Sequence, residues 1–310
     1  MKSFLANCWK HKAYVIMALP VFVILLLFAY VPMFGLVMAF KKLDYAQGVW
    51  NSPFYGFGDL KGESIFHNFS FLWKSKDTLF NMLRNTLMYY FIFTILGTFL
   101  NIVVAIAFDQ FVLKKTAKVM QSIVIIPVFI SYAAVQFIVY AYLNSRTGMI
   151  NEVFNLSTKW YSEPKYWPII LTIVKMWNSV GYGSVLYMSV LAGVDSQLYE
   201  AAKIDGANKW QQILHVALPS LIPMISVMLL LSVGGIMHSD TGLFYQVTRD
   251  IGQLKPTTRV VDSYILGMIL HTSEPGFTAA ASLLQSVIGT LMILLANYAV
   301  RKIEPDNSLF

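Results

Sequence analysis

Six long apolar segments constrain the fold of this chain more than any other feature of its sequence. A helix needs about 20 mainly apolar residues to cross about 30 Å of membrane hydrocarbon. Stretches of that kind occupy residues 13–40, 83–108, 119–143, 167–191, 221–237 and 277–300. We therefore predict an all-α membrane protein with six transmembrane helices.

Composition narrows the class of protein further. Hydrophobic residues make up 57% of the 310 residues and charged residues only 13%, whereas charged residues are about a quarter of an average soluble domain. The single cysteine, Cys8, excludes an internal disulfide framework and a cysteine metal cluster. The first apolar stretch is too long for a signal peptide, so we expect an uncleaved helix. The formal charge of +7 is scattered through loops, which argues against nucleic acid as a partner.

The positions of lysine and arginine predict the orientation. If six helices alternate in direction, three basic clusters fall on the same side: Lys2, Lys10 and Lys12; Lys114, Lys115 and Lys118; and Arg301 with Lys302. Basic residues near helix ends favour the cytoplasm. We expect cytoplasmic tails at 1–12 and 301–310, one transmembrane domain at 13–300, and outer loops at 41–82, 144–166 and 239–276.

The cytoplasmic segment 195–219 carries the most distinctive local pattern. Asp195 or Ser196 can cap a short helix, Gly206 can end it, and Asn208 can cap a second helix. The predicted structure is a helix, a glycine corner and another helix.

The surface of the first of these helices fits contact with a soluble partner. Leu198, Ala201 and Ala202 place small or apolar groups on one face, and Glu200 offers a carboxylate to a basic side chain. The alternative is an amphipathic loop that lies on the bilayer surface.

Residues 199–223, YEAAKIDGANKWQQILHVALPSLIP, resemble the EAA loop of ABC importer permeases. The matching positions are Glu200, Ala201, Ala202, Asp205, Gly206, Ala207, Ile213, Leu218 and Pro219. Six helices, with this loop before the penultimate one, are similar to the carbohydrate (maltose-type) branch of that family. The runs Pro32-Met33-Phe34-Gly35-Leu36 and Arg249-Asp250-Ile251-Gly252 resemble LplB-type permeases, a subgroup associated with oligo- and polysaccharide uptake.

The resemblance implies the permease subunit of a bacterial type I importer in the cell membrane. Its expected partners are a second, similar permease that completes a heterodimer, two ATPase subunits, an extracellular binding protein, a saccharide substrate and membrane lipid. The residues expected to couple to the ATPase are Tyr199, Glu200, Ala201, Ala202, Asp205, Gly206 and Ala207. ATP and magnesium belong to the partner ATPase subunits, because this chain contains no G-x-x-x-x-G-K-[ST] motif. The residues expected to contact the binding protein are Arg249, Asp250, Arg259 and Tyr264.

Small and polar residues on the fourth and fifth apolar segments are candidates for the substrate path, partly by resemblance to the maltose-type sugar site. They are Trp177, Asn178, Val180, Gly181, Tyr182, Ser184, Ser232, Gly235, His238 and Ser239. Several amide and aromatic positions of the maltose-type site are Ser, Gly or Val here, so a direct sugar site and a wider passage both remain open. Close helix packing is a third explanation, and Trp177 also fits an interfacial aromatic belt. Lys175 must extend to the membrane boundary or face a wet cavity.

Other functions find less support in the sequence. The EAA pattern does not encode the cargo, so a peptide or another polar solute is the alternative substrate. An ion-coupled secondary transporter would need a carboxylate near the middle of a span and an inverted repeat, and neither is evident. The five histidines are dispersed, and neither a metal site nor a catalytic residue is expected.

Overall fold

The computed structural model describes residues 10–74, 76–110, 114–271 and 274–303, so most of the two predicted tails, Cys8 included, lies outside the described residues. The described part is helical, and its β pairing is confined to one isolated bridge between Lys41 and Phe54. The predicted all-α fold is thus confirmed. The chain divides into two compact units: unit 1 comprises Met1–Lys74 and Met268–Leu284, and unit 2 comprises Ser75–Gly267 and Gln285–Phe310.

Unit 1 begins with a continuous apolar helix, Lys12–Phe40, that is long enough to span a membrane. It consists of α2 (Lys12–Leu25), η1 (Leu26–Tyr30) and η2 (Val31–Phe40). A loop region follows with the short helices α3 (Gly48–Asn51), η3 (Gly58–Leu60), η4 (His67–Phe69) and α4 (Phe71–Lys74). In α2 and η1 every residue is exposed and most are apolar, which suits a helix whose solvent is lipid or another membrane helix.

A buried lysine organises the loop region of unit 1. Lys41 is only 3% exposed. Its Nζ donates to the carbonyl oxygens of Val49 at 3.0 Å and Trp50 at 2.7 Å, and it lies 4.5 Å from the centre of the Phe54 ring. These bonds offset the cost of burying the ammonium group. The loop is therefore folded around this lysine.

Asn68 fixes the same region to the end of the first helix. Its buried amide donates to the carbonyl oxygens of Met38, Ala39 and Lys41 at 3.3, 3.1 and 3.0 Å. Gly276, at the start of α15, lies so close that a Cβ there would come within 2.5 Å of the Asn68 amide nitrogen.

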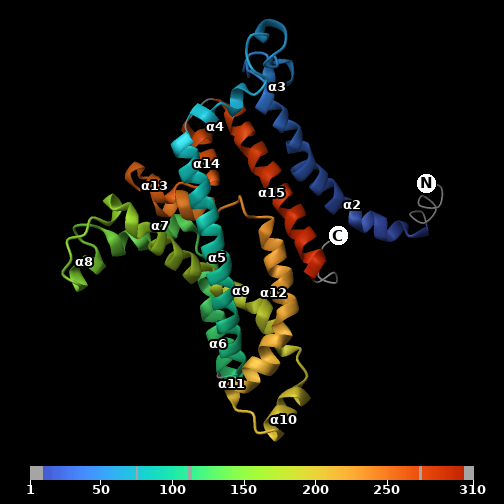
Figure 1. Ribbon diagram of the computed structural model, residues 1–310, viewed down its shortest axis with the longest axis vertical. Coiled ribbons are helices and arrows are strands. Elements are labelled where there is room, and N and C mark those ends of the chain that lie inside the picture. Colours follow the sequence, from blue (N-terminus) through green and yellow to red (C-terminus); the bar gives the residue numbers. More distant parts are fainter. Residues whose placement is uncertain (1–9, 75, 111–113, 272–273, 304–310) are drawn as a thin grey trace. The chain divides into compact units, whose positions relative to one another are not determined.

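Unit 2 contains the remaining helices (Figure 1). They are α5 (Lys76–Gln110), α6 (Lys114–Ile125), η5 (Ile126–Phe129), α7 (Tyr132–Leu143), α8 (Met149–Val153), η6 (Trp160–Ser162), η7 (Pro164–Tyr166), α9 (Trp167–Ala192), α10 (Ser196–Ile204), α11 (Lys209–Gln212), η8 (Ile213–Ala217), α12 (Leu218–Val233), η9 (Gly242–Val247), η10 (Gly252–Leu254) and α13 (Lys255–Thr258). Two further helices, α14 (Val261–His271) and α15 (Pro275–Ile303), belong partly to each unit.

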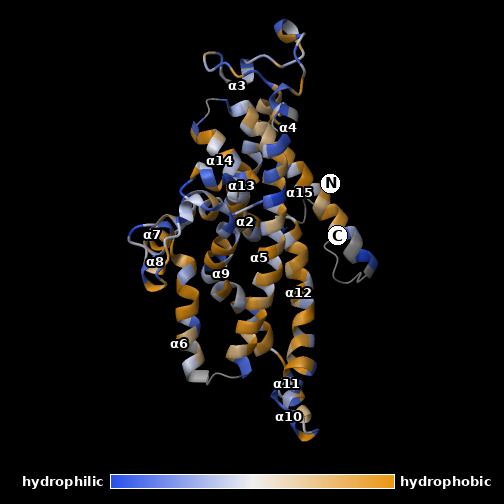
Figure 2. Ribbon diagram, turned by 60° about the vertical axis from the view of Figure 1, so that its left-hand side comes forward, coloured by the Kyte–Doolittle hydropathy of each residue, from blue (hydrophilic) through white to orange (hydrophobic). Residues whose placement is uncertain are grey.

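The centre of unit 2 is the packing of α5 against α9. Tyr89 is 1% exposed and meets the Phe244 ring edge-on at 4.7 Å, while Trp167 and Leu171 are fully buried in the same cluster. On its other face α5 exposes an apolar stripe with a spacing of four residues, which is one side of a helix: Leu87, Phe91, Ile95, Phe99 and Val103. Figure 2 shows α5 and α12 largely in the hydrophobic colour. Such a stripe suits contact with lipid or a partner helix.

The third predicted span is bent rather than straight. Five continuous helices of the described residues are long and apolar enough to cross a membrane, and the sixth candidate is the pair Val119–Phe129 and Tyr132–Leu143, which meet at 96°. Pro127 lies in the last turn before the bend, and Ile130 and Ser131 have extended backbone. A proline removes a helical hydrogen bond, which explains why the helix stops there.

The fifth span also differs from its predicted bounds. Its continuous helix is Lys209–Val233, so it starts earlier than residue 221 and ends before residue 237. Gly234 and Gly235 follow α12, and residues 238–240 have no regular structure. Two glycines in succession weaken a helix at this point. The resulting break separates α12 from η9 and exposes backbone and polar side chains inside unit 2.

Candidate functional site

The predicted helix–glycine–helix corner is present. Asp195 caps α10 by accepting a hydrogen bond from the backbone nitrogen of Gln197 at 2.9 Å. At the other end, the Ala207 nitrogen donates to the carbonyl of Ala202 at 2.9 Å, and Gly206 has a φ of +81°. This left-handed conformation is the one that glycine adopts without strain.

The second helix of the corner is capped as well. Asn208 and Gln211 form a reciprocal capping box, with hydrogen bonds of 3.0 and 2.7 Å. Gln212 is buried and its amide donates to the carbonyl of Ala207 at 3.0 Å. Because both ends of the corner are tied by their own side chains, it is a rigid element.

The corner presents a mixed apolar and acidic surface. Leu198 is 53% and Ile204 87% exposed, although both are large apolar side chains. Glu200, Ala201, Asp205 and Gly206 are exposed too, and Ala202 and Ala207 are partly buried. A hollow of about 290 Å³ lies on the corner, lined by Ala202, Asp205, Gly206, Ala207, Gln211, His215 and Val216. Figure 1 shows α10 and α11 at the lower end of α12.

Tyr199 is partly buried, whereas Glu200 is exposed. Burial, and then the charge of Asp109 near the end of α5, raises the pKa of its hydroxyl above the usual range. Tyr199 therefore anchors α10 to the body of unit 2 and leaves Glu200 on the free surface.

A cavity of about 160 Å³ lies beside the break after α12. Its walls come from α5, α9, the break itself and η9. The lining residues are Tyr89, Tyr90, Phe93, Thr94, Lys175, His238, Ser239, Asp240 and Phe244. The lining thus combines aromatic rings with charged and hydroxyl groups.

Lys175 and Asp240 form an ion pair in this cavity. The Nζ–Oδ2 distance is 3.1 Å, and the side chains are 24% and 32% exposed. The Tyr132 hydroxyl, which donates to Oδ1 of Asn178 at 3.3 Å, also lies near Asp240. Lys175 thus faces the cavity, which is one of the two alternatives that the sequence left open, and Asp240 removes most of the cost of placing a cation there.

A second polar cluster lies behind the first. Asp262 accepts from the amide of Gln285 at 2.8 Å and from the backbone nitrogen of Ser239, and its Oδ1 is 3.8 Å from Nδ1 of His238. Gln285 also bonds the carbonyl of Met237 at 2.6 Å. Sequence reasoning missed Asp240 and Asp262 as site residues. The sequence did contain one signal for Asp262. Its carboxylate lies in a mostly uncharged run, Val260-Val261-Asp262-Ser263-Tyr264.

The predicted path residues of the fifth segment lie at this break. His238 and Ser239 line the cavity, and the Ser232 hydroxyl is 3.1 Å from that of Tyr90, another lining residue. Gly235 is within the break itself.

The predicted path residues of the fourth segment lie in other surroundings. Asn178 is buried and donates to the carbonyl of Pro127 at 2.7 Å, Gly181 contacts the backbone of Val124, and the Ser184 hydroxyl donates to Gly181 at 2.8 Å. These contacts favour the packing explanation for the three residues. Val180 is partly buried and Tyr182 is 61% exposed. A path role for all of them stays a prediction.

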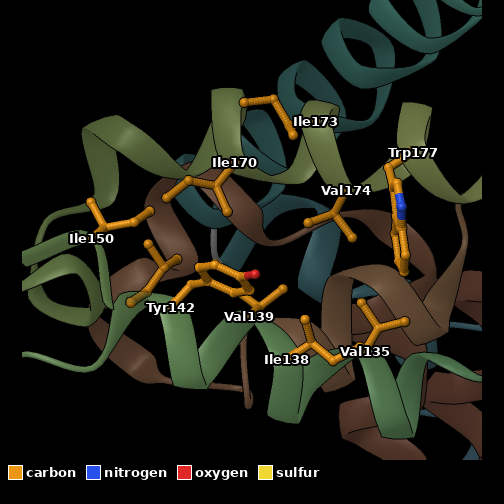
Figure 3. Close-up of a pocket in the computed structure, with 10 residues that line it drawn as sticks. Val135, Ile138, Val139, Tyr142, Ile150, Ile170, Ile173, Val174 and Trp177 are labelled. Atoms are coloured by element: carbon orange, nitrogen blue, oxygen red, sulfur yellow. The ribbon is translucent and has the colours of Figure 1, made fainter. Parts of the chain in front are cut away.

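Trp177 lies in a different hollow, an apolar groove of about 380 Å³ between α7 and α9 (Figure 3). Figure 3 shows its indole beside Val174 and Val135, with Ile138 and Tyr142 further along. Apart from the Tyr142 hydroxyl and the Trp177 ring nitrogen, the lining side chains consist of hydrocarbon.

The four residues expected to contact a binding protein shape their own loop. Arg249 lies 4.5 Å from the centre of the Tyr140 ring, Asp250 pairs with Lys255 at 3.1 Å, and Arg259 lies 5.8 Å from the Tyr264 ring. Arg249 and Asp250 have positive φ angles of 57° and 47°, which mark a tight turn. Arg249 is exposed. Contact with a binding protein stays a prediction for all four.

Comparison with known proteins places the chain in a family. The family described as "Binding-protein-dependent transport system inner membrane component" matches residues 1–305. Protein LplB of Bacillus subtilis is 26% identical over 308 residues, which cover 98% of this chain and 93% of that protein. The polygalacturonan/rhamnogalacturonan transport system permease protein YteP of the same organism is 27% identical over 311 residues, or 97% and 91% of the two chains.

Comparison with solved structures supports the same assignment. A chain in the crystal structure of a bacterial ABC transporter involved in the import of the acidic polysaccharide alginate superposes with a TM-score of 0.83 and 25% identity, covering 97% of this chain and 99% of that one. The same kind of transporter in complex with a periplasmic protein bound to alginate pentasaccharide gives 0.82 and 26%, covering 96% and 97%. The resemblance to ABC importer permeases and the type I permease fold are confirmed. The chain therefore belongs to the family of binding-protein-dependent transport system inner membrane components and is a multi-pass membrane permease.

Proposed function

We propose that this chain is the permease subunit of an ATP-driven importer that moves an oligo- or polysaccharide into a bacterial cell. The observation that carries the saccharide assignment is similarity along almost the whole chain, 96% or more, to YteP and to the permease of the alginate importer. In this arrangement both termini are cytoplasmic, as the positions of lysine and arginine predict.

The α10–α11 corner is the proposed docking point for an ATPase subunit. A docking element transmits force only if it is rigid, and the caps at Asp195 and Asn208 supply that rigidity. Glu200 offers a carboxylate to a basic side chain of the ATPase, while Leu198 and Ile204 offer apolar contact area. Two ATPase subunits, which hold ATP and magnesium, a second permease and an extracellular binding protein complete the proposed importer.

The cavity at the break after α12 is the proposed substrate path of this subunit. Sugar rings bind by placing their carbon faces against aromatic side chains and their hydroxyls against polar groups. The aromatic side chains of this cavity include Tyr90, Phe93 and Phe244. Its polar groups include Thr94, His238 and Ser239.

Two substitutions in the corner test the coupling. Glu200→Ala removes the anchoring carboxylate, and Gly206→Pro forces a φ near −65° where the corner needs +81°. Each should leave membrane assembly of the complex largely intact while reducing substrate-stimulated ATP hydrolysis and uptake together, at least tenfold. Asp195→Asn is the matched control, since it also removes a carboxylate from this segment but keeps a good capping residue.

Normal coupling in both variants would show that the corner does not dock an ATPase. The cargo is tested separately, by uptake of saccharide and peptide panels through the wild-type importer. Uptake of peptides without any saccharide would replace the saccharide assignment by the alternative of a peptide permease.

A further inference from the structure

The charges in the cavity after α12 bear on which sugar it can hold, an inference that rests on the proposed function. Lys175 and Asp240 are the charged side chains of its lining, accompanied by the imidazole of His238. With the Lys175 Nζ at 3.1 Å from Asp240 Oδ2, the ammonium charge is already compensated by a carboxylate.

A second carboxylate adds negative charge next to the cavity. Asp262 lies behind His238, with 3.8 Å between Oδ1 and Nδ1, and its side chain is 17% exposed. The groups that bond it, Gln285 and the Ser239 backbone, are neutral. Lys175, Asp240 and Asp262 sum to −1, and a protonated His238 would bring the cluster only to zero. Among the described residues of this site, no cation is left over for an anionic ligand.

The volume of the cavity limits the size of the sugar unit that it can hold. Its volume of about 160 Å³ is below the roughly 300–1,000 Å³ of sites for drug-sized ligands. It therefore accommodates about one sugar ring of a longer chain. A carboxylate on that ring would lie within the range in which like charges repel strongly in a partly buried site.

The aromatic side chains of the lining carry no charge, and contacts between their rings hold them in place. Phe244 meets Tyr89 edge-on at 4.7 Å and lies nearly parallel to Phe93 at 6.1 Å. Tyr89 and Phe244 are buried and support Phe93, so the partly buried rings of Phe93 and Tyr90 are the ones that can face a pyranose. Thr94 and Ser239 offer hydroxyl groups, which pair with sugar hydroxyls without needing a charge.

From this arrangement we infer that the cavity admits a neutral sugar unit and discriminates against a unit that carries a carboxylate. The selectivity of this subunit then differs from that of the alginate importer, whose cargo is described as an acidic polysaccharide. Asp240 is the residue that sets the preference, because it cancels the charge of Lys175.

The test uses the whole importer in proteoliposomes, with this permease, its partner permease, the ATPase and the binding protein. The probes are free and methyl-esterified tetramers of galacturonate, guluronate and glucuronate, which differ in charge and by one methyl group per unit, together with neutral tetramers of galactose, xylose and glucose. The measured quantity is the ratio of neutral to acidic uptake. It should exceed ten in the wild type. Asp240→Asn, which leaves Lys175 without a counter-ion, should lower the ratio at least tenfold.

Two further variants keep the test decisive. Lys175→Gln leaves Asp240 unpaired, so the ratio should rise, at least threefold, and this holds even where Asp240→Asn fails to assemble. Glu163→Gln removes a carboxylate that pairs with Lys165 at 3.4 Å outside the cavity, and its ratio should stay within twofold of the wild type. The binding protein is the same throughout, so a change in the ratio belongs to the permease.

Each outcome bears on the inference. A wild-type importer that takes up the free acids as fast as the esters, or a ratio unchanged in both Asp240→Asn and Lys175→Gln, overturns the inference but leaves the saccharide function standing. Uptake of peptides with none of the saccharides overturns the proposed function as well.

Discussion

Gly181 of α9 offers a quantitative test of whether the fourth segment packs or lines the path. A Cβ added there would lie 1.8 Å from the carbonyl oxygen of Val124 and 2.4 Å from its carbonyl carbon, both backbone atoms of α6. Since ordinary contact begins at 3.4 Å, Gly181→Ala requires α6 and α9 to separate locally by about 1.6 Å. Overpacking of this kind costs about 1–3 kcal/mol, and backbone atoms cannot rotate away as a side chain can.

Gly97 on α5 is the matched control. A Cβ there meets only the end of the Met176 side chain, at 3.9 Å. Replacing glycine by alanine inside a helix, without a clash, stabilises by roughly 0.5–1 kcal/mol. The two alanine variants should therefore differ by about 1.5–4 kcal/mol, which corresponds to at least about 3 °C in melting temperature at 2–4 °C per kcal/mol.

The assay heats the purified complex in detergent and measures the fraction that stays monodisperse. The half-life of the complex at one temperature is a second readout, because membrane proteins often unfold irreversibly. Gly181→Ala should melt below the wild type and Gly97→Ala at or above it. Equal melting of the two variants would contradict the packing explanation. If Gly181→Ala kept its stability but changed the concentration of saccharide needed for half-maximal uptake, Gly181 would belong to the substrate path.

Three further outcomes follow from local contacts. Asn68→Ala removes a buried amide that bonds three carbonyl groups, so it should destabilise the outer loop by about 1–3 kcal/mol, measured as faster limited proteolysis within residues 41–74. Gly206→Ala meets nothing within 4 Å but must adopt a φ of +81°, so it should cost about 1–2 kcal/mol in the stability of the complex, whereas Gly62→Ala, with open space and no positive φ, should cost little. Burial raises the pKa of Tyr161 to about 12, so the unfolded chain, whose tyrosines ionise near pH 10, loses this proton first. The stabilising contribution of Tyr161 is complete below about pH 10 and is lost as the pH rises toward 12; Tyr161→Phe should flatten that part of an alkaline stability profile.

The membrane helices and the α10–α11 corner were predictable because their signals are local. A run of apolar residues identifies a span without knowledge of its neighbours, and Asp195, Gly206 and Asn208 each act within three residues of their own position. The capping of α10 and α11 therefore agrees with the sequence residue by residue.

The bend at Pro127 and the break after Val233 were not predicted, and the reason is physical. Proline and glycine are tolerated inside membrane helices when neighbouring groups satisfy the freed backbone, so their presence alone does not decide between a continuous and a broken helix. Here Asn178, on α9, donates to the Pro127 carbonyl at 2.7 Å. Gln285, on α15, donates to the Met237 carbonyl at 2.6 Å. Those partners lie about 50 residues away along the chain.

The Lys175–Asp240 pair shows the same limit at the candidate site. The two residues are 65 positions apart, and neither apolar periodicity nor a short motif connects them. Lys175 alone indicates only that a charge must be accommodated; the fold determines that a carboxylate does so.

The α10–α11 corner and the cavity lie at opposite ends of one continuous helix, Lys209–Val233. At about 1.5 Å per residue its 25 residues extend roughly 37 Å. Because Asn208 caps the first end and the glycines of the break begin at Gly234, we expect a displacement of the corner to be carried along this helix to the break. Asp240 lies just beyond that break, whereas Lys175 is on α9. If the corner docks an ATPase subunit as proposed, we expect its movement to alter the distance of 3.1 Å between the two side chains, and this ion pair would then connect the docking point to the proposed substrate path.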